Sequence, residues 1–204
     1  LNAHPHTDCC NKIAVVHNGI IENYAHLKRD LIGRGHIFRS DTDTEVIVHL
    51  LEEAYSGDIL SAVQKVVPLL EGSYAILVIA EGDDRLITAR NQSPLVLGIG
   101  DGEFLAASDI TPLLEYTNRV IYLDDGDIAE IRPDGYCIYQ HTVITKRPVQ
   151  EIEWAPDTVQ KGGFSHFMIK EIYEQPAVIN RAIHSLSEEN FPCFLRDARS
   201  MTVV

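Results

Sequence analysis

Apolar residues recur at helical spacing between residues 22 and 70, whereas the apolar residues that follow come in short runs typical of strands. An earlier apolar run at residues 12–17 predicts a buried strand. Residues 22–33, with Leu27 and Leu31 four positions apart, predict a helix. The chain therefore opens with a strand followed by helices.

Two further helices are predicted before residue 70. The apolar stripe of the first consists of Val46, Leu50 and Ala54. Asp41 or Thr42 is a candidate N-cap for it. Residues 55–58 predict its end and an N-cap for the next helix, from about 59 to 70, where Pro68 weakens the last turn.

After Gly72 the pattern changes to short strands separated by turns rich in Gly or Asp. The predicted strands are residues 74–80, 85–89, 95–99, 104–107, 120–123, 127–131 and 136–139. This order favours an α+β fold, with sheets and with helices on their outer faces, over a doubly wound parallel sheet.

The last third of the chain divides into three parts. Residues 142–166, with scattered Pro and Gly and little periodicity, are expected to be a linker after a first domain at residues 1–141. Residues 167–184 predict a helix, which Pro176 should kink or restart. Residues 185–204 stay unassigned.

Composition removes several classes of function. A net charge of -13 argues against nucleic-acid binding, which needs clustered Lys and Arg. No apolar run is long enough for a membrane helix, and no signal peptide is recognised at the start. The four cysteines have neither disulfide nor zinc spacing, so a reduced, cytoplasmic protein without cofactors is expected.

The dipeptide Asn18-Gly19 is the first candidate for chemistry. Amide hydrolysis passes through an oxyanion, and an Asn side-chain amide with the N–H of the following Gly can supply two donors to it. Gly also lets the backbone approach a ligand closely. Taken alone, however, Asn-Gly is also a strong signal for a hairpin turn.

Asp43 is the second candidate. A carboxylate at the mouth of a helix can hold the free α-amino group of a substrate. The alternative is ordinary N-capping by Asp41, Thr42 or Asp43, and both roles can coexist within this run.

A third candidate is the His-x-His-x-Asp pattern of His4, His6 and Asp8, which could be read as a zinc hydrolase motif. That motif expects a preceding strand and a further His where Cys9 stands, so no metal site is assigned. Cys9 and Cys10 have no base beside them in the sequence, so neither is assigned as a nucleophile.

Several separated motifs resemble the glutaminase domain of the glutamine–fructose-6-phosphate aminotransferase family, also called glucosamine-6-phosphate synthase. They are NAHPH at 2–6, VVHNGIIENY at 15–24, SDTDTE at 40–45, ARNQSPLVLG at 89–98, ASD at 107–109, GDIAE at 126–130 and MIKEIYEQP at 168–176. The last is similar to the segment that leads into the sugar-isomerase domain of that family, so the 167–184 helix is taken as its first helix.

The resemblance implies an N-terminal-nucleophile (Ntn) hydrolase-like fold, a four-layer α/β/β/α sandwich of antiparallel sheets. It implies that an N-terminal cysteine attacks glutamine and that the ammonia serves to convert fructose 6-phosphate into glucosamine 6-phosphate. By position, Asn18 and Gly19 match the oxyanion hole and Asp43 the substrate-binding carboxylate. His4, His6 and His17 match orienting or structural residues, with no metal.

The chain departs from the family at its start. By the resemblance, a cysteine, a carboxylate-binding loop and the first strands are expected before Leu1, and the sequence does not contain them. The expectation is a truncated domain without glutaminase activity, which binds glutamine, meets fructose 6-phosphate only through an isomerase domain, and contacts neither nucleic acid nor membrane. A homodimer and a non-catalytic glutamine-binding or protein-interaction module stay open as alternatives.

Overall fold

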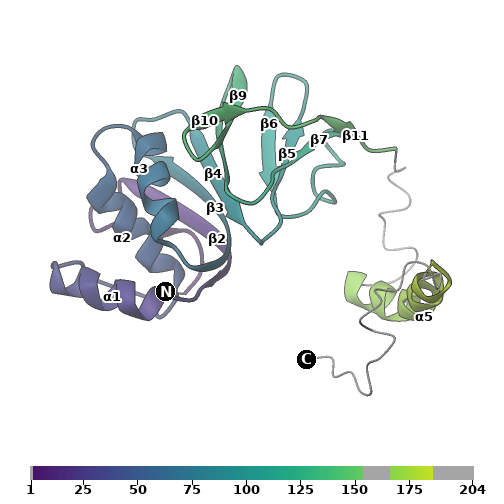
Figure 1. The fold of residues 1–204 in the computed structure, drawn as a ribbon, viewed down its shortest axis with the longest axis horizontal. Coiled ribbons are helices and arrows are strands. Elements are labelled where there is room, and N and C mark those ends of the chain that lie inside the picture. The colour runs from purple at the N-terminus through teal and green to yellow at the C-terminus, as the bar shows by residue number, and fades with distance from the viewer. Residues whose placement is uncertain (1, 154–165, 186–204) are drawn as a thin grey trace, which may run out of the picture. The chain divides into compact units, whose positions relative to one another are not determined.

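The computed structural model describes residues 2–153 and 166–185 (Figure 1). The chain divides into two compact units, residues 1–153 and 154–204, and each is described here by itself. The first unit contains three helices and two antiparallel sheets in its described part. No helix in the described ranges is long and apolar enough to cross a membrane.

The larger sheet has seven strands, and every neighbouring pair is antiparallel. Their order is β1 (His6–Thr7), β2 (Ile13–Ile21), β3 (Gly72–Ala80), β4 (Leu86–Asn91), β8 (Asp127–Arg132), β9 (Gly135–Gln140) and β10 (Val143–Thr145). The predicted strands after Gly72 are thereby confirmed to within a few residues.

Three helices cover one face of this sheet (Figure 1). They are α1 (Tyr24–Gly33), α2 (Thr44–Ala54) and α3 (Ile59–Val66), and a short 3₁₀ helix at Val67–Leu69 follows the last. Pro68 lies in this 3₁₀ turn, because its ring cannot continue an α-helix. The side chain of Asp58 caps α3 by accepting a hydrogen bond from the Ser61 N–H, as the sequence predicted.

The opposite face of the larger sheet packs on a smaller, four-stranded sheet. Its order is β11 (Gln150–Glu151), β7 (Arg119–Tyr122), β5 (Val96–Ile99) and β6 (Phe104–Ala107). Strand β3 alternates between the two cores: Ile76 and Val78 pack under the helices, and Ala75 and Leu77 pack toward the small sheet. This two-sided burial explains why β3 is a continuous apolar run.

Turns in the segment at residues 108–118, rather than a helix, cover the outer face of the small sheet. Leu113 from this segment packs on Val96 and Val120. The α+β class with antiparallel sheets is confirmed, and within residues 2–153 one outer face carries helices and the other carries turns.

Two local expectations were wrong. Asn18 and Gly19 do not form a turn, because both lie inside β2, opposite Ala75 and Tyr74 of β3. The first part of the predicted linker is not a free connection either, because β10 and β11 pair with the two sheets. Short edge strands of this kind depend on their partners and carry little periodicity of their own.

The second unit contains one described helix, α5 (Phe167–Ser185). It contains Pro176 within its bounds, so no new helix begins there, and the kink expected at Pro176 stays a prediction. The assignment of this helix and of residues 1–141 to domains of a longer protein stays a prediction. The tail at residues 186–204 lies outside the described residues.

Gly72 provides a test of the β2–β3 pairing. Its φ is +112°, and a Cβ there would lie 2.3 Å from the carbonyl oxygen of Ile20 on the neighbouring strand. We expect Gly72→Ala to lower the free energy of unfolding by about 2 kcal/mol or more, through backbone strain and steric overlap. Gly135→Ala is the control, because a Cβ there meets no atom within 4 Å. Urea denaturation of both variants measures this, and equal stability would show that the approach of the two strands is not tight.

Candidate functional site

Asn18 and Gly19 lie on an exposed stretch in the second half of β2. The side-chain amide of Asn18 makes no hydrogen bond with any other residue in the described ranges. Gly19 has a φ of +136°, and a Cβ there would lie 2.1 Å from the carbonyl oxygen of Ser73 on β3. Only glycine fits this position, so the backbone next to the Asn18 amide is left without a side chain.

Asp43 immediately precedes α2, yet its carboxylate does not cap the helix. Its Oδ2 instead accepts a hydrogen bond of 2.7 Å from the backbone N–H of Ile21, at the end of β2. Capping by Asp41 or Thr42 is wrong as well, because Asp43 occupies the N-cap position. Asp43 is half-buried, and its other carboxylate oxygen makes no hydrogen bond within the described residues.

Thr44 forms the second contact between α2 and β2. Its hydroxyl lies 3.0 Å from Nδ1 of His17 and 3.2 Å from Nε2 of His4. Burial lowers the pKa of His17, so its imidazole is neutral at neutral pH. The hydroxyl of Thr44 can accept from one ring and donate to the other.

These two contacts bracket the Asn18–Gly19 pair. His17 precedes the pair and contacts Thr44, and Ile21 follows it and contacts Asp43. The start of α2 is therefore held beside the exposed part of β2. An unpaired amide, a bare backbone segment and a half-buried carboxylate suit a small ligand with a polar carbonyl at one end and an ammonium group at the other.

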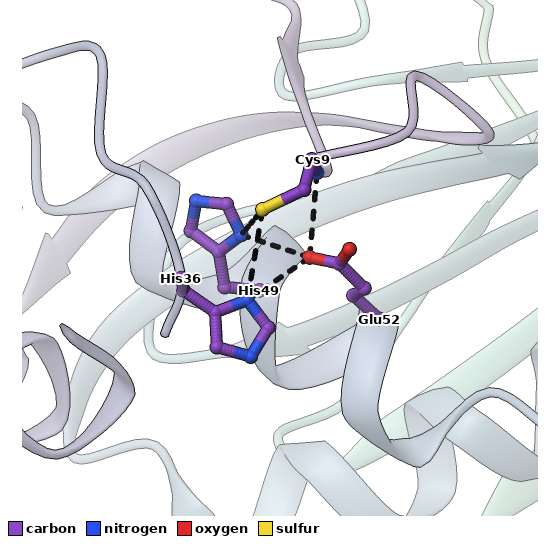
Figure 2. Close-up of side chains that lie close together, drawn as sticks. All are labelled: Cys9, His36, His49 and Glu52. Atoms are coloured by element: carbon purple, nitrogen blue, oxygen red, sulfur yellow. Dashed lines mark hydrogen bonds and ion pairs between the residues drawn. The ribbon is translucent and has the colours of Figure 1, made fainter. Parts of the chain in front are cut away.

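The thiol of Cys9 does not have the surroundings of an activated nucleophile (Figure 2). Its Sγ lies 3.8 Å from Nδ1 of both His36 and His49, and Glu52 accepts a hydrogen bond from its backbone N–H. Burial raises the pKa of the Cys9 thiol, and the neighbouring Glu52 carboxylate adds to this shift. A raised pKa disfavours the thiolate that nucleophilic attack requires.

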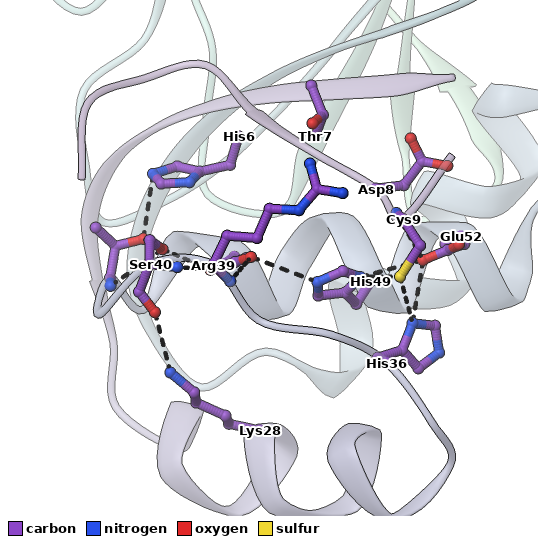
Figure 3. A network of polar contacts seen from close by, with 12 residues as sticks. His6, Thr7, Asp8, Cys9, Lys28, His36, Arg39, Ser40, His49 and Glu52 are labelled. Carbon is purple, nitrogen blue, oxygen red and sulfur yellow. Dashed lines mark hydrogen bonds and ion pairs between the residues drawn. The ribbon is translucent and has the colours of Figure 1, made fainter. Parts of the chain in front are cut away.

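A network of polar contacts continues from the site along the N-terminal half of α2 (Figure 3). Nε2 of His6 lies 3.1 Å from the Thr42 hydroxyl, which lies 2.9 Å from the Ser40 hydroxyl. Glu45 accepts hydrogen bonds from the Ser40 hydroxyl and from the backbone N–H groups of Ser40 and Arg39. These bonds outweigh the opposing effect of burial and lower the pKa of Glu45. The SDTDTE run is therefore one hydrogen-bonded turn.

The structure does not bring together the residues of the His-x-His-x-Asp pattern as metal ligands. His4 and His6 contact Thr44 and Thr42, and neither joins a cluster of three metal-ligating side chains within residues 2–153 and 166–185. Asp8 instead closes a loop, because its carboxylate accepts from the backbone N–H groups of residues 10, 12 and 13.

The sequence analysis assigned no individual role to several residues of this polar network, namely Ser40, Thr44, Glu45, His49 and Glu52. Their signal was present as polar side chains just before and along a helix, α2, that is otherwise largely apolar. The His-x-x-Glu spacing of His49 and Glu52 places both on one face of α2.

Comparisons with known proteins show which family the chain resembles. A family model described as a glutamine amidotransferase domain matches residues 2–115. The chain is 51% identical over 193 residues to a glutamine–fructose-6-phosphate aminotransferase (isomerizing) from Thermococcus kodakarensis, covering 92% of the chain and 32% of that relative. It is 47% identical over 207 aligned positions to the enzyme of the same name from Aquifex aeolicus, covering 100% of the chain and 35% of that relative. The chain thus spans about a third of the length of these relatives.

Among solved structures, the chain is similar to a glutamine phosphoribosylpyrophosphate amidotransferase from B. subtilis, with a TM-score of 0.59 and 25% identity. That match covers 69% of this chain and 32% of the other. An allosteric regulatory enzyme of purine biosynthesis matches with a TM-score of 0.58 and 26% identity, covering 69% of this chain and 31% of the other. These likenesses confirm the predicted Ntn-hydrolase-like fold class. The match over residues 2–115 shows that the chain belongs to the glutamine amidotransferase domain family.

Proposed function

We propose that residues 1–141 form the glutamine-binding side of a glutaminase site that supplies ammonia for the conversion of fructose 6-phosphate into glucosamine 6-phosphate. The observation that carries the proposal is the pair of contacts from Thr44 and Asp43 to β2 on either side of Asn18-Gly19. The similarity to relatives named for glutamine and fructose 6-phosphate supports it. Fructose 6-phosphate would be handled by an isomerase domain, and a homodimer stays a prediction.

In this proposal Asn18 and Gly19 stabilise the oxyanion that forms when the glutamine side-chain amide is attacked. The Asn18 amide is unpaired within the described residues, and the missing side chain at Gly19 leaves room for the substrate carbonyl. A lost oxyanion donor costs on the order of 3 kcal/mol in the transition state. His4, His6 and His17 act by holding Thr42 and Thr44, and through them the turn that carries Asp43.

Asp43 would bind the α-amino group of glutamine through the carboxylate oxygen that Ile21 does not use. A hydrogen bond between charged groups of this kind contributes about 1.5–3 kcal/mol. The carboxylate is already oriented by the Ile21 N–H, so little side-chain entropy is lost when the ligand binds.

Glutamine binding to the 204-residue chain tests this role. We expect Asp43→Asn to weaken binding at least tenfold, because the ammonium group loses its counter-charge while the Asn oxygen can still accept from Ile21. Asp41→Asn is the matched control, since Asp41 is exposed in the same turn, and its affinity should stay within twofold. Isothermal titration calorimetry measures both. Equal weakening in the two variants, or none in either, contradicts the assignment of Asp43.

Hydrolysis requires a nucleophile that residues 1–204 do not supply in this proposal. The resemblance implies an N-terminal cysteine in this role, and Cys9 does not replace it, because burial raises the pKa of its thiol. Loss of the nucleophile reduces turnover about a millionfold in a serine protease.

The 204-residue chain on its own is therefore expected to release no ammonia from glutamine above the uncatalysed rate. An ammonia-release assay, run with the unmodified chain, Asn18→Ala and the exposed control Asn118→Ala, measures this. If the unmodified chain and Asn118→Ala release ammonia and Asn18→Ala does not, the expectation is wrong and the chain contains a substitute nucleophile.

Glu45 should support the site in a pH-dependent way. Because its pKa is lowered in the folded state, its ionised form stabilises the fold fully above the unfolded-state pKa of about 4.3. That contribution is lost as the pH falls through the lower folded-state value. Glu45→Gln should cost about 1–3 kcal/mol at pH 7, because its amide would face the N–H groups of Arg39 and Ser40.

Urea unfolding at several pH values between 7 and 3 checks this. The stability difference between the unmodified chain and Glu45→Gln should shrink toward the acid end. Glu71→Gln, at an exposed position, is the control and should show a small difference at every pH. A constant penalty for Glu45→Gln across the range would show that its charge is not what stabilises the turn.

A further inference from the structure

A cluster of four metal-ligating side chains lies apart from the Asn18–Gly19 pair, at the other end of the polar network. Cys9 comes from the loop after β1, His36 from the connection that follows α1, and His49 and Glu52 from one face of α2. One ligand atom of each lies within 4.8 Å of all the others (Figure 2). Three segments distant in sequence thus converge on one point.

Four of the six separations between the ligand atoms lie close to those around a tetrahedral zinc ion. Zinc–sulfur bonds of about 2.3 Å and zinc–nitrogen or zinc–oxygen bonds of about 2.0 Å place sulfur and nitrogen about 3.5 Å apart and nitrogen and oxygen about 3.3 Å apart. The Sγ of Cys9 is 3.8 Å from each histidine Nδ1. Oε2 of Glu52 is 3.0 Å from Nδ1 of His36 and 3.1 Å from Nδ1 of His49. Small shifts of side chains bring all four distances to the expected values.

The outer ring nitrogens of both histidines lie near carboxylates. Nε2 of His36 lies 3.1 Å from a Glu53 oxygen, and Nε2 of His49 lies 3.7 Å from a Glu45 oxygen. Histidines that bind a metal almost always direct the other ring nitrogen to a carboxylate, a carbonyl or water, which fixes the tautomer with Nδ1 as the metal-binding atom. The His36 ring shows this arrangement, whereas Nε2 of His49 is buried without a hydrogen-bond partner among the described residues and has the Glu45 carboxylate as its nearest charged neighbour.

Burial distinguishes the cluster from a surface group of acidic residues. The His49 side chain is 1% exposed, and those of His36 and Glu52 are 12% and 21% exposed. A mixed set of one sulfur, two imidazole nitrogens and one carboxylate oxygen suits zinc rather than the hard cations calcium and magnesium.

We propose that Cys9 Sγ, His36 Nδ1, His49 Nδ1 and Glu52 Oε2 bind one zinc ion. With four protein ligands the coordination is closed, so the site is structural. The ion fastens the loop after β1 and the connection after α1 to α2, whose N-terminus carries Asp43. The site does not depend on the proposed glutaminase function, because none of its ligands contacts glutamine in that proposal.

The test uses the 204-residue chain expressed in zinc-supplemented medium. Elemental analysis should find one zinc ion per chain. The metal-free chain titrated with Co²⁺ should develop the near-ultraviolet absorption of a thiolate–cobalt bond. Cys9→Ser and His36→Asn should each retain at least tenfold less zinc. Cys137→Ser and His26→Asn, which alter a distant cysteine and an exposed histidine, should retain as much zinc as the unmodified chain.

Glu53→Gln adds a test that leaves all four ligands in place. Glu53 contacts only the outer nitrogen of His36 among the proposed ligands. The variant removes the negative charge of this partner while its amide oxygen can still accept from His36, so zinc affinity should fall about tenfold, the lower end of the effect of losing such a partner, and the stoichiometry should still reach one at high zinc. If Cys9→Ser fails to fold by circular dichroism, the Glu53→Gln affinity and the cobalt spectrum of the unmodified chain decide the matter.

Three results would overturn the proposal. The unmodified chain could contain no zinc and show no thiolate–cobalt absorption. Cys9→Ser and His36→Asn could fold and keep full zinc, which would indicate adventitious binding. Cys10→Ser could lose zinc while Cys9→Ser keeps it, which would assign the ion to the neighbouring group of Asp8, Cys10 and Glu52.

Discussion

The hydrogen bond from the Ile21 N–H to the Asp43 carboxylate is the contact on which the arrangement of the site depends. It joins the end of β2 to the start of α2, and the Thr44–His17 contact joins the same two elements four residues earlier along β2. Every residue of α2 from Thr44 to Leu51 is buried, so packing against the apolar core holds the helix on the sheet. The two polar contacts hold its N-terminus. The exposed half of β2 gains a fixed carboxylate beside it because both constraints act together.

Periodicity predicted the helices and the strands of the sheets well, because both are long enough to show a repeat. It failed where pairing between distant segments outweighed a local preference. Asn18-Gly19 has the sequence of a turn, but β3 pairs with it in register and the bare Gly19 allows the two backbones to meet. Asp43 has the sequence of an N-cap, but the Ile21 N–H takes its carboxylate. Nothing within a few residues of either position encodes these partners.

The candidate site shows the same division. The resemblance to a family pointed to Asn18, Gly19 and Asp43 through the motifs that contain them. The structure places these motifs next to one another. The residues that hold the motifs were not predicted, because their partners are far away in the chain. His4 contacts Thr44 forty positions later, and Cys9 lies beside His49 at the same separation. A single sequence shows which residues can form hydrogen bonds or bind metals, but not which of them will meet.

The polar residues around α2 form one continuous layer, and this continuity links the proposed zinc cluster to the glutamine side. From Glu52 the contacts pass through His49 to Glu45, and from Glu45 through Ser40 to the turn before Asp43. Burying a polar group costs free energy unless the group is hydrogen-bonded. A substitution at one residue of this layer therefore leaves the neighbouring polar groups without a partner. A disturbance at Cys9 or His36 would therefore reach the turn of Ser40 and Thr42, which precedes Asp43, through these contacts. The apolar core under α2 could stay unchanged, because it packs on the opposite side of the same helix.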